Sequence, residues 1–330
     1  MSKFVRIIEN GTFEDYSPQD LIHNDVNQFK NWKCSAGSEG LFIDWDGIVW
    51  PATCEIGKEQ SKLGSLKDNN PIKLLGDYIT CNHKYCPCLV EIYLPKYKKL
   101  KKQLNETQLG NVSLKKFSAV TRASEFDRDR KYIMWAFGRK CNFSCSYCDD
   151  NSHSKLDQDL VTEFSIEKAL QYAEQFRQGK SIMWSFTGGE PTINPLFLDL
   201  VKYLKAKGDT ITVATNGSAS HEYYNELAQV ANINISVHYQ FLKPAKLRRV
   251  CTTIVNANPD WFGLNFMIMP GMAETTYKYF EQVKDIPGFL NRTTLNFDIL
   301  RKKNTELYEI YSQKDMDLIK KLQTGAVNEI

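Results

Sequence analysis

From Tyr132 onward the chain alternates short apolar runs with longer segments of helical periodicity. Short runs rich in β-branched and aromatic side chains are typical of buried strands, whereas apolar residues recurring every three or four positions indicate helices. The expected strands are Tyr132–Phe137, Ser181–Phe186, Thr210–Thr215, Ile233–Tyr239, Gly263–Met269 and Thr294–Leu300. The expected helices are Ser165–Gln178, Pro195–Ala206, Ser220–Ala231, Pro244–Asn256 and Glu274–Lys284.

This alternation predicts parallel strands joined by crossover helices, which is an α/β fold. Six consecutive β/α units over residues 131–301 fit a partial TIM-like barrel or a doubly wound sheet. Both folds place active sites at the carboxyl ends of their strands. We therefore look for chemistry directly after each expected strand.

Residues 1–94 have a different pattern and are expected to form a small cysteine-rich α+β domain. The segment Gly40–Trp50 reads as a hairpin, with Asp46-Gly47 as its turn. A core this small gains stability from a bound metal. Residues 95–130 are lysine-rich and weakly patterned, so they are expected to be a linker, and residues 302–330 are expected to be a helical segment.

Composition and charge narrow the class of protein. The chain has 330 residues, of which 42% are hydrophobic and 25% charged, as in globular proteins. A net charge of +3 does not indicate a polyanionic partner, and the lysine run at 96–102 reads as a solvated face, so no nucleic-acid partner is expected. Neither a signal peptide nor an apolar run of about 18 residues is present, so we expect a cytoplasmic protein without a membrane partner.

The nine cysteines fall into groups. In a reducing compartment, clustered thiols more often bind metal than form disulfides. One group lies near the N-terminus, a second follows the strand at Tyr132–Phe137, and Cys251 stands alone and reads as a buried apolar residue. The first group is Cys34, Cys54, Cys81, Cys86 and Cys88, and the second is Cys141, Cys145 and Cys148. Two metal centres are therefore predicted.

Three motifs follow three successive strands and are expected to converge. Cys141, Cys145 and Cys148 follow the first strand, the TGGEP segment (Thr187–Pro191) the second, and Thr215–Gly217 the third. Three thiolates suit either zinc or an iron–sulfur cluster. A zinc site would need a fourth ligand, for which His153 is a candidate, whereas a cluster with three cysteine ligands keeps one iron open. In TGGEP, the glycines allow close backbone approach and Glu190 offers a carboxylate to an amino group.

The sequences CNFSCSYC (141–148) and GGEP (188–191) resemble the motifs of the radical S-adenosylmethionine (radical SAM) enzymes. The resemblance implies a partial (β/α)6 barrel carrying a 4Fe-4S cluster on Cys141, Cys145 and Cys148. It also implies S-adenosylmethionine bound at the open iron. Reductive cleavage of that molecule would yield a 5′-deoxyadenosyl radical, which abstracts a hydrogen atom from the substrate.

The same resemblance implies further cofactor-binding residues. Gly188, Gly189 and Glu190 match the segment that holds the methionine amino group. Asn216 matches a motif at the end of the third strand, and Ser236 occupies a fourth-strand position that contacts the ribose or carboxylate. His238 stands where many members have an aspartate, so it either faces substrate or caps the strand.

The N-terminal cysteines resemble SPASM, an auxiliary iron–sulfur domain of peptide-modifying radical enzymes. The resemblance implies one auxiliary 4Fe-4S cluster on Cys34, Cys54 and Cys81, with Cys86 or Cys88 as the fourth ligand. Here the domain would precede the barrel instead of following it, and it has fewer cysteines than a full domain. A zinc site built from the same residues, with His83, is the alternative, since thiolate spacing does not select the metal.

The leading hypothesis is a radical SAM enzyme, either an oxidoreductase or a catalyst of radical-based modification, acting on a peptide or protein. One alternative substrate is a nucleotide or cofactor precursor, and a non-catalytic zinc or iron–sulfur module is the non-enzymatic alternative. The expected partners are S-adenosylmethionine, an electron donor such as flavodoxin or ferredoxin, and the peptide or protein substrate.

Overall fold

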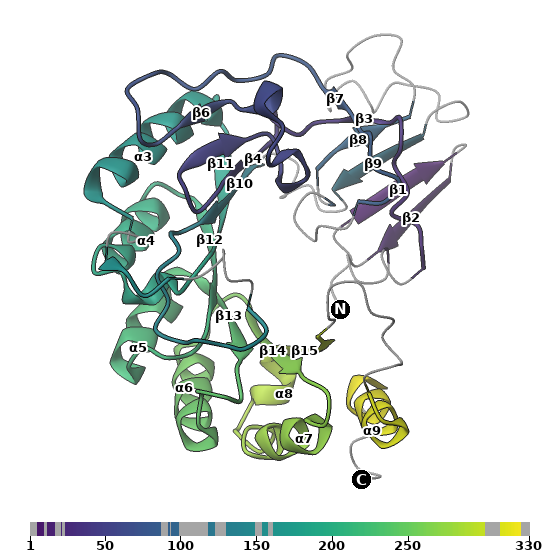
Figure 1. Ribbon diagram of the computed structural model, residues 1–330, viewed down its shortest axis with the longest axis vertical. Coiled ribbons are helices and arrows are strands. Elements are labelled where there is room, and N and C mark those ends of the chain that lie inside the picture. Colours follow the sequence, from purple (N-terminus) through teal and green to yellow (C-terminus); the bar gives the residue numbers. More distant parts are fainter. Residues whose placement is uncertain are drawn as a thin grey trace. The chain divides into compact units, whose positions relative to one another are not determined.

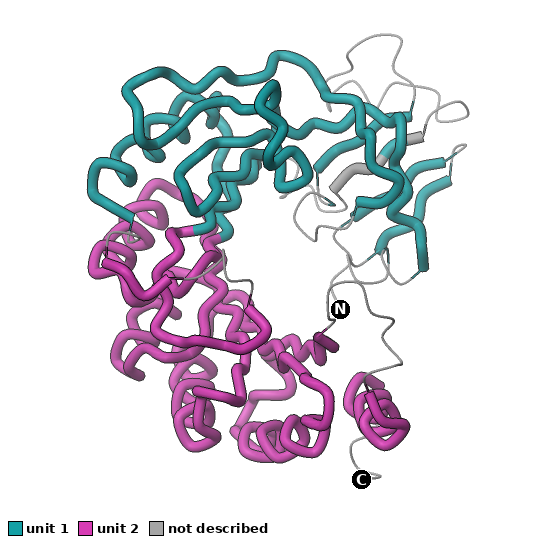
Figure 2. The backbone as a smooth tube through the Cα atoms, in the orientation of Figure 1, with its two compact units in different colours: residues 1–136, 161–185 teal, residues 137–160, 186–330 magenta. Residues whose placement is uncertain are grey.

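The computed structural model describes residues 5–9, 12–16, 21, 24–86, 92, 94–98, 118–122, 130–148, 154–157, 161–300 and 311–324. The chain divides into two compact units (Figure 2). Unit 1 comprises Met1–Ala136 and Val161–Ser185, and unit 2 comprises Phe137–Leu160 and Phe186–Ile330. Cys88 and His153 lie outside the described residues.

Unit 1 contains an antiparallel sheet of six short strands in the order β2-β1-β9-β8-β3-β7 (Figure 1). The strands are β1 (Val5–Glu9), β2 (Thr12–Tyr16), β3 (Lys33–Cys34), β7 (Ile79–Thr80), β8 (Lys96–Tyr97) and β9 (Ser118–Arg122). The pairing of β1 with β9 joins Val5 to Arg122. An apolar cluster that includes Val5, Leu21 and Phe29 is buried beside this sheet.

Two of these strands, β8 and β9, lie within residues 95–130, where the sequence suggests a linker. They pair with each other and with strands from the start of the chain. The described part of this segment is therefore built into unit 1. Such strands are difficult to predict from the sequence, because they are stabilised by pairing with distant segments and not by a local pattern of residues.

The expected hairpin is confirmed. Strands β4 (Gly40–Ile43) and β5 (Ile48–Trp50) pair antiparallel, with Gly47 at φ +77° in the turn. The carboxylate of Asp44 accepts hydrogen bonds from the N–H groups of Asp46 and Ile48 and from the Trp50 indole. The hairpin pairs onward with β6 (Gly64–Ser65), and on its other side β4 runs parallel to β10 (Arg130–Ala136).

Among the described residues, unit 1 also contains a long helix and two short 3-10 helices. These are α3 (Glu163–Arg177), η1 (Thr53–Glu55) and η2 (Glu59–Ser61). The helix α3 begins at Thr162, whose hydroxyl accepts a hydrogen bond from the Ser165 N–H, as an N-cap does. The strand β11 (Ser181–Thr187) belongs to unit 1 as far as Ser185, and its last two residues belong to unit 2.

Unit 2 is built on four neighbouring parallel strands joined by helices (Figure 1). The strands are β12 (Thr210–Thr215), β13 (Asn232–Val237), β14 (Phe262–Ile268) and β15 (Thr293–Ile299). The helices are η7 (Pro191–Ile193), α4 (Phe197–Ala206), α5 (His221–Val230), α6 (Pro244–Ala257), α7 (Ala273–Glu281), α8 (Phe289–Arg292) and α9 (Gln313–Thr324). The described residues form a mixed α/β fold with a parallel-strand sheet and no closed barrel, which agrees with the expected partial barrel.

Half-buried and buried residues alternate strictly along β12 and β13. Ile233, Ile235 and Val237 are fully buried, whereas Asn232, Asn234 and Ser236 are half-buried. One face of each strand therefore packs into the core and the opposite face carries polar groups. No described helix is long and apolar enough to cross a membrane.

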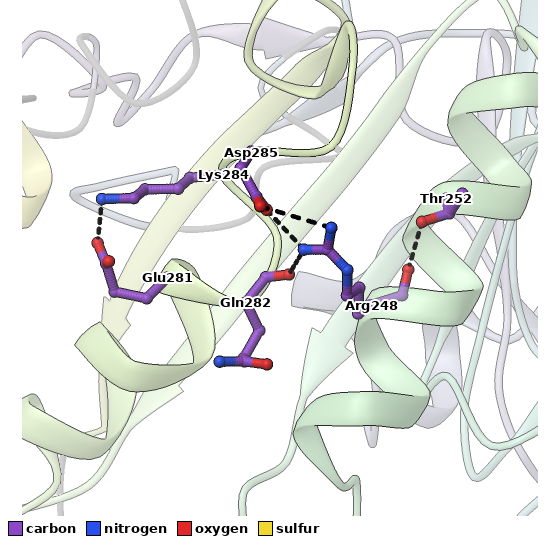
Figure 3. A network of polar contacts seen from close by, with 6 residues as sticks. All are labelled: Arg248, Thr252, Glu281, Gln282, Lys284 and Asp285. Carbon is purple, nitrogen blue, oxygen red and sulfur yellow. Dashed lines mark hydrogen bonds and ion pairs between the residues drawn. The ribbon is translucent and has the colours of Figure 1, made fainter.

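Polar contacts fix the helices at the rim of unit 2 (Figure 3). Arg248 on α6 donates to the Gln282 carbonyl and to the Asp285 carboxylate just beyond α7. The Arg248 guanidinium lowers the pKa of Asp285. The helix α9 is anchored by Asp315, whose carboxylate accepts hydrogen bonds from the N–H groups of Gly271 and Ala273.

Candidate functional site

The cysteine loop, residues 138–148, follows β10 and is fixed by neighbours on both sides. On one side, Gly189 N–H donates to Gly138 O at 3.0 Å and Glu190 N–H donates to Lys140 O at 2.8 Å. On the other side, Ser154 N–H donates to Arg139 O at 2.7 Å, and its carbonyl accepts from Cys141 N–H at 2.8 Å. The two predicted motifs are thus brought together by backbone hydrogen bonds.

Gly189 makes this approach feasible. A Cβ atom at this position would lie 2.2 Å from Lys140 O and 2.5 Å from Arg139 O. The preceding Gly188 has φ +118°, a backbone conformation that side chains disfavour. The sequence predicted that these glycines allow close approach, and what approaches them is the backbone of the cysteine loop.

The three thiols of the loop differ in exposure. Cys145 is buried, Cys141 is half-buried and Cys148 is exposed. Burial raises the pKa of Cys141 and raises that of Cys145 to about 11. The Lys155 ammonium opposes both shifts. The Cys148 thiolate adds to the raised pKa of Cys141, and the Cys148 and Cys141 thiolates add to that of Cys145.

Several groups that the sequence analysis did not single out support the loop. Lys155 donates to the carbonyls of Cys141 and Phe143. The Phe143 N–H points to the Cys141 sulfur at 3.4 Å. The side chain of Gln240 forms two hydrogen bonds with Ser146, one to its N–H and one to its hydroxyl. A lone lysine or glutamine has no motif, so sequence alone gave no signal for these roles.

Glu190 is buried, at 2% exposure, and its carboxylate is already engaged. Its Oε1 accepts hydrogen bonds from the Thr192 N–H and from the hydroxyls of Thr192 and Thr215. Its Oε2 accepts from the Asn216 N–H at 2.6 Å. Burial raises the pKa of Glu190, and these four bonds oppose the shift. This differs from the expectation of a carboxylate available to an amino group, because the protein itself uses its oxygens.

Asn216 joins the end of β12 to the cysteine loop. Its side-chain Nδ2 donates to Asn142 Oδ1 at 2.9 Å and lies 3.8 Å from the Cys141 sulfur. Its Oδ1 accepts from the Ser218 N–H. The structure therefore brings Asn216 to the thiols, as the motif order suggested.

His238 lies directly beyond β13 and contacts the cysteine loop. Its Nδ1 forms a short hydrogen bond with the Tyr147 hydroxyl, and the two rings stack with centroids 5.8 Å apart. The Phe143 ring meets it edge-on and also stacks on Phe241. Burial lowers the pKa of His238 to about 4, so the imidazole is neutral near pH 7. The sequence left two roles open for His238, facing substrate or capping the strand. These contacts indicate a third role, in which His238 positions Tyr147.

Ser236 is half-buried on β13, and its register neighbour on β14 is Asn265. Asn265 is paired in turn with Asn296 on β15, whose side-chain amide donates to Asn265 Oδ1 at 2.7 Å. These residues form a polar row across three strands. Among the described residues, the structure records no contact between Ser236 and the thiols. The predicted role of Ser236 in contacting the ribose or carboxylate therefore stays a prediction.

The N-terminal cysteines are distributed over two apolar clusters of unit 1. Cys34 is buried, and Cys54 packs against the same cluster. Cys86 is buried in another cluster, with Val5 and Ile7. The Cys81 thiol points to the His83 carbonyl. Cys88 lies outside the described residues, and the auxiliary cluster stays a prediction.

Comparison with known proteins identifies the segment that carries these motifs. Residues 135–257 match the model of the Radical SAM superfamily. This segment therefore resembles a radical SAM domain. Members of this superfamily are enzymes that use a 4Fe-4S cluster and S-adenosylmethionine, which supports the predicted cofactors.

Curated relatives match part of this chain over part of their own length. A probable GTP 3′,8-cyclase of Thermococcus kodakarensis is 29% identical over 125 residues, which are 38% of this chain and 40% of the relative. A tungsten-containing aldehyde ferredoxin oxidoreductase cofactor-modifying protein of Pyrococcus furiosus is 31% identical over 101 residues, 30% of this chain and 28% of the relative. The chain thus spans less than half of the length of these relatives.

Among solved structures, SuiB of Streptococcus suis bound to the precursor peptide SuiA has a TM-score of 0.45 and 13% identity. The match covers 60% of this chain and 46% of SuiB. The resemblance to a SPASM domain stays a prediction.

The cysteine loop fits the cluster that the superfamily uses. Each thiolate of such a cluster binds a different iron, so the three sulfurs surround the cluster instead of meeting at one ion. The three thiols interact electrostatically, and the Phe143 N–H and the Asn216 amide point to the Cys141 sulfur. Hydrogen bonds to cluster sulfurs are one way in which a protein sets a reduction potential.

Proposed function

We propose that this chain is a radical SAM enzyme whose cluster is held by Cys141, Cys145 and Cys148. The observation that carries this proposal is the pair of backbone hydrogen bonds from Gly189 and Glu190 to Gly138 and Lys140. They hold TGGEP against the loop that bears the thiols. When bound, the cluster and S-adenosylmethionine supply a one-electron reductive cleavage that initiates hydrogen abstraction from the substrate.

Residues of TGGEP and Asn216 have separate roles in this proposal. Because the Glu190 carboxylate is engaged by Thr192, Thr215 and Asn216, we assign it to positioning. The main-chain carbonyls of Gly188 and Gly189 are then the groups that receive the methionine amino group. Asn216, which reaches the Cys141 sulfur, positions the loop from the end of β12.

The substrate we propose is a peptide or protein. None of the strands β12, β13, β14 and β15 contains a lysine or arginine, and their polar face carries amides, hydroxyls and the Asp298 carboxylate. Amide and hydroxyl groups suit the hydrogen-bonding groups of a peptide, whereas a triphosphate is usually held by arginine or lysine. This face therefore favours a substrate without phosphate groups.

A nucleotide is the second candidate. It is supported by the curated relatives named GTP 3′,8-cyclase, including one of Rhizobium leguminosarum that is 30% identical over 43% of this chain. Such a substrate would need basic groups from outside the four strands.

Product formation tests the reaction. The protein is reconstituted anaerobically with iron and sulfide, reduced with dithionite and supplied with S-adenosylmethionine, and 5′-deoxyadenosine is measured. The wild type should form it and Cys145→Ala should not. The matched control is Cys251→Ala, which alters a fully buried thiol on α6 and should retain product formation. A cluster-loaded wild type that forms no 5′-deoxyadenosine would refute the proposal.

Isotope transfer tests the substrate class. Deuterated peptides encoded beside the gene and deuterated GTP are supplied in separate reactions, and deuterium is measured in the 5′-deoxyadenosine formed. Transfer from a peptide supports the first candidate. Transfer from GTP alone supports the second and overturns the first.

A further inference from the structure

Three ligand-type side chains come together in unit 1, away from the cysteine loop in sequence. The Cys54 sulfur, a Glu55 carboxylate oxygen and a His83 ring nitrogen all lie within 4.8 Å of one another. Within the described part of the chain, this is the one such group of three or more metal-ligating residues. Sequence reasoning named Cys54 and His83 but not Glu55.

The carboxylate of Glu55 is held in place by its own neighbours. Cys54 and Glu55 lie in η1, and Glu55 is buried. The Ser61 hydroxyl donates to Oε2 at 2.8 Å, and the Lys58 ammonium donates to Oε1 at 2.9 Å. Carboxylates that bind metals are commonly oriented by such hydrogen bonds, and their oxygens have lone pairs left for an ion.

The imidazole of His83 has an unsatisfied nitrogen. Its Nε2 is buried and has no hydrogen-bond partner among the described residues. A buried polar atom without a partner costs about 1–3 kcal/mol, which a metal–ligand bond would recover. The segment is fixed at Cys81, whose N–H donates to Trp32 O at 2.8 Å and whose carbonyl accepts from Asn31 N–H at 2.8 Å.

We propose that Cys54, Glu55 and His83 bind a single zinc ion whose fourth position is open. Thiolate, carboxylate and imidazole are the donors zinc takes, and three protein ligands with one open position are typical of its reactive sites. Ligand atoms around tetrahedral zinc lie roughly 3.5 Å apart. Side-chain rotations that move each ligand atom by about 1 Å would therefore bring the three atoms to zinc-binding distances. Zinc binding replaces the Cys54 thiol proton, which is released to solvent.

This site differs from the auxiliary iron–sulfur prediction in the residues it needs. The zinc site requires Glu55 and His83, which are not ligands of the predicted cluster. Cys86, which the cluster could require, is buried in the other apolar cluster of unit 1. Substitution of Glu55 or His83 therefore separates the two.

The test measures zinc and iron in the full chain. Protein reconstituted anaerobically with iron and sulfide is supplied with Zn²⁺, freed of unbound metal by gel filtration and analysed by mass spectrometry for both elements. The wild type should retain one zinc per chain, and Glu55→Gln and His83→Gln should lose it with iron unchanged. The controls are Glu59→Gln in the neighbouring η2 and His221→Gln on α5, which should keep zinc.

Three results would overturn the proposal: no zinc in the wild type, zinc retained in both variants, or iron lost with Glu55 or His83. Circular dichroism reports whether each variant folds. X-ray absorption at the zinc edge identifies the zinc ligands of the wild type directly, without any variant. One sulfur and two nitrogen or oxygen protein ligands are expected, and four sulfurs would contradict the assignment.

Discussion

The Asn216 N–H donates a 2.6 Å hydrogen bond to the carboxylate of Glu190, across the ends of two strands. Glu190 follows β11 and Asn216 follows β12. The same carboxylate accepts three further bonds from Thr192 and Thr215. Asn216 in turn reaches the Cys141 sulfur, so this buried carboxylate indirectly fixes the position of a thiol that we propose as a cluster ligand.

Glu190→Gln should destabilise the protein. The glutamine amide places a donor where one oxygen now accepts, facing either the Asn216 N–H or the two threonines. We expect the free energy of unfolding to fall by about 1–3 kcal/mol, measured by urea denaturation. The control is Glu174→Gln on α3, where the carboxylate is exposed and pairs with Arg177, and it should change little. Equal stabilities of the two variants would contradict the positioning role.

Gly189→Ala should separate TGGEP from the cysteine loop. The added methyl group would meet two backbone oxygens, which cannot move aside as a side-chain tip can. We expect a loss of about 1–3 kcal/mol and a lower iron content after reconstitution. The matched control is Gly76→Ala, because a Cβ at Gly76 meets nothing within 4 Å. Normal iron content in Gly189→Ala would show that the close approach is dispensable.

Stability should depend on pH through His238. Burial lowers its pKa from 6.5 to about 4 in the folded protein, so the unfolded chain binds more protons between these values. The free energy of unfolding should therefore be constant above about pH 6.5 and fall by up to about 3 kcal/mol as the pH drops towards 4. Urea denaturation across this range measures the slope. His238→Gln should flatten it, and an unchanged slope would assign it to other groups.

Lys155→Met should speed the loss of iron from the cysteine loop while changing the free energy of unfolding little. Lys155 is exposed, so its two bonds to loop carbonyls should contribute no more than about 1 kcal/mol to stability. The loop that it ties down bears the cluster ligands, so we expect faster iron loss in air. Lys168→Met on α3 is the control, since Lys168 donates to Gln171 on the surface. Equal rates of iron loss in both variants would remove Lys155 from this role.

Periodicity predicted β12 and β13 of unit 2 well because burial alternates along both strands. Thr210–Thr215 has the same bounds in the structure, and the predicted strand Ile233–Tyr239 shifts to Asn232–Val237. It ends earlier because the chain turns at His238, whose carbonyl accepts from the N–H groups of Phe241 and Leu242. Residue type alone did not reveal that turn.

The parts that could not be predicted depend on contacts between distant segments. Strand β9 pairs with β1 more than 100 positions away, and no local pattern marks it. Glu55 becomes a candidate metal ligand only when the fold brings His83 beside it. Similarly, Glu190 was expected to face a ligand because its motif is local, whereas two of the bonds that engage it come from Thr215 at the end of β12 and from Asn216 directly after it.

The hydrogen bonds that fix residues 138–141 between TGGEP and Ser154 have a kinetic consequence. Ordering a loop costs roughly 1–2 kcal/mol of conformational entropy per residue. In this protein the chain itself supplies backbone hydrogen bonds on both sides of that stretch, which favour its ordered form. Cluster insertion should then be limited by delivery of iron and sulfide and not by folding of the loop. Backbone amides such as that of Cys141 should accordingly resist hydrogen exchange even before the metal arrives.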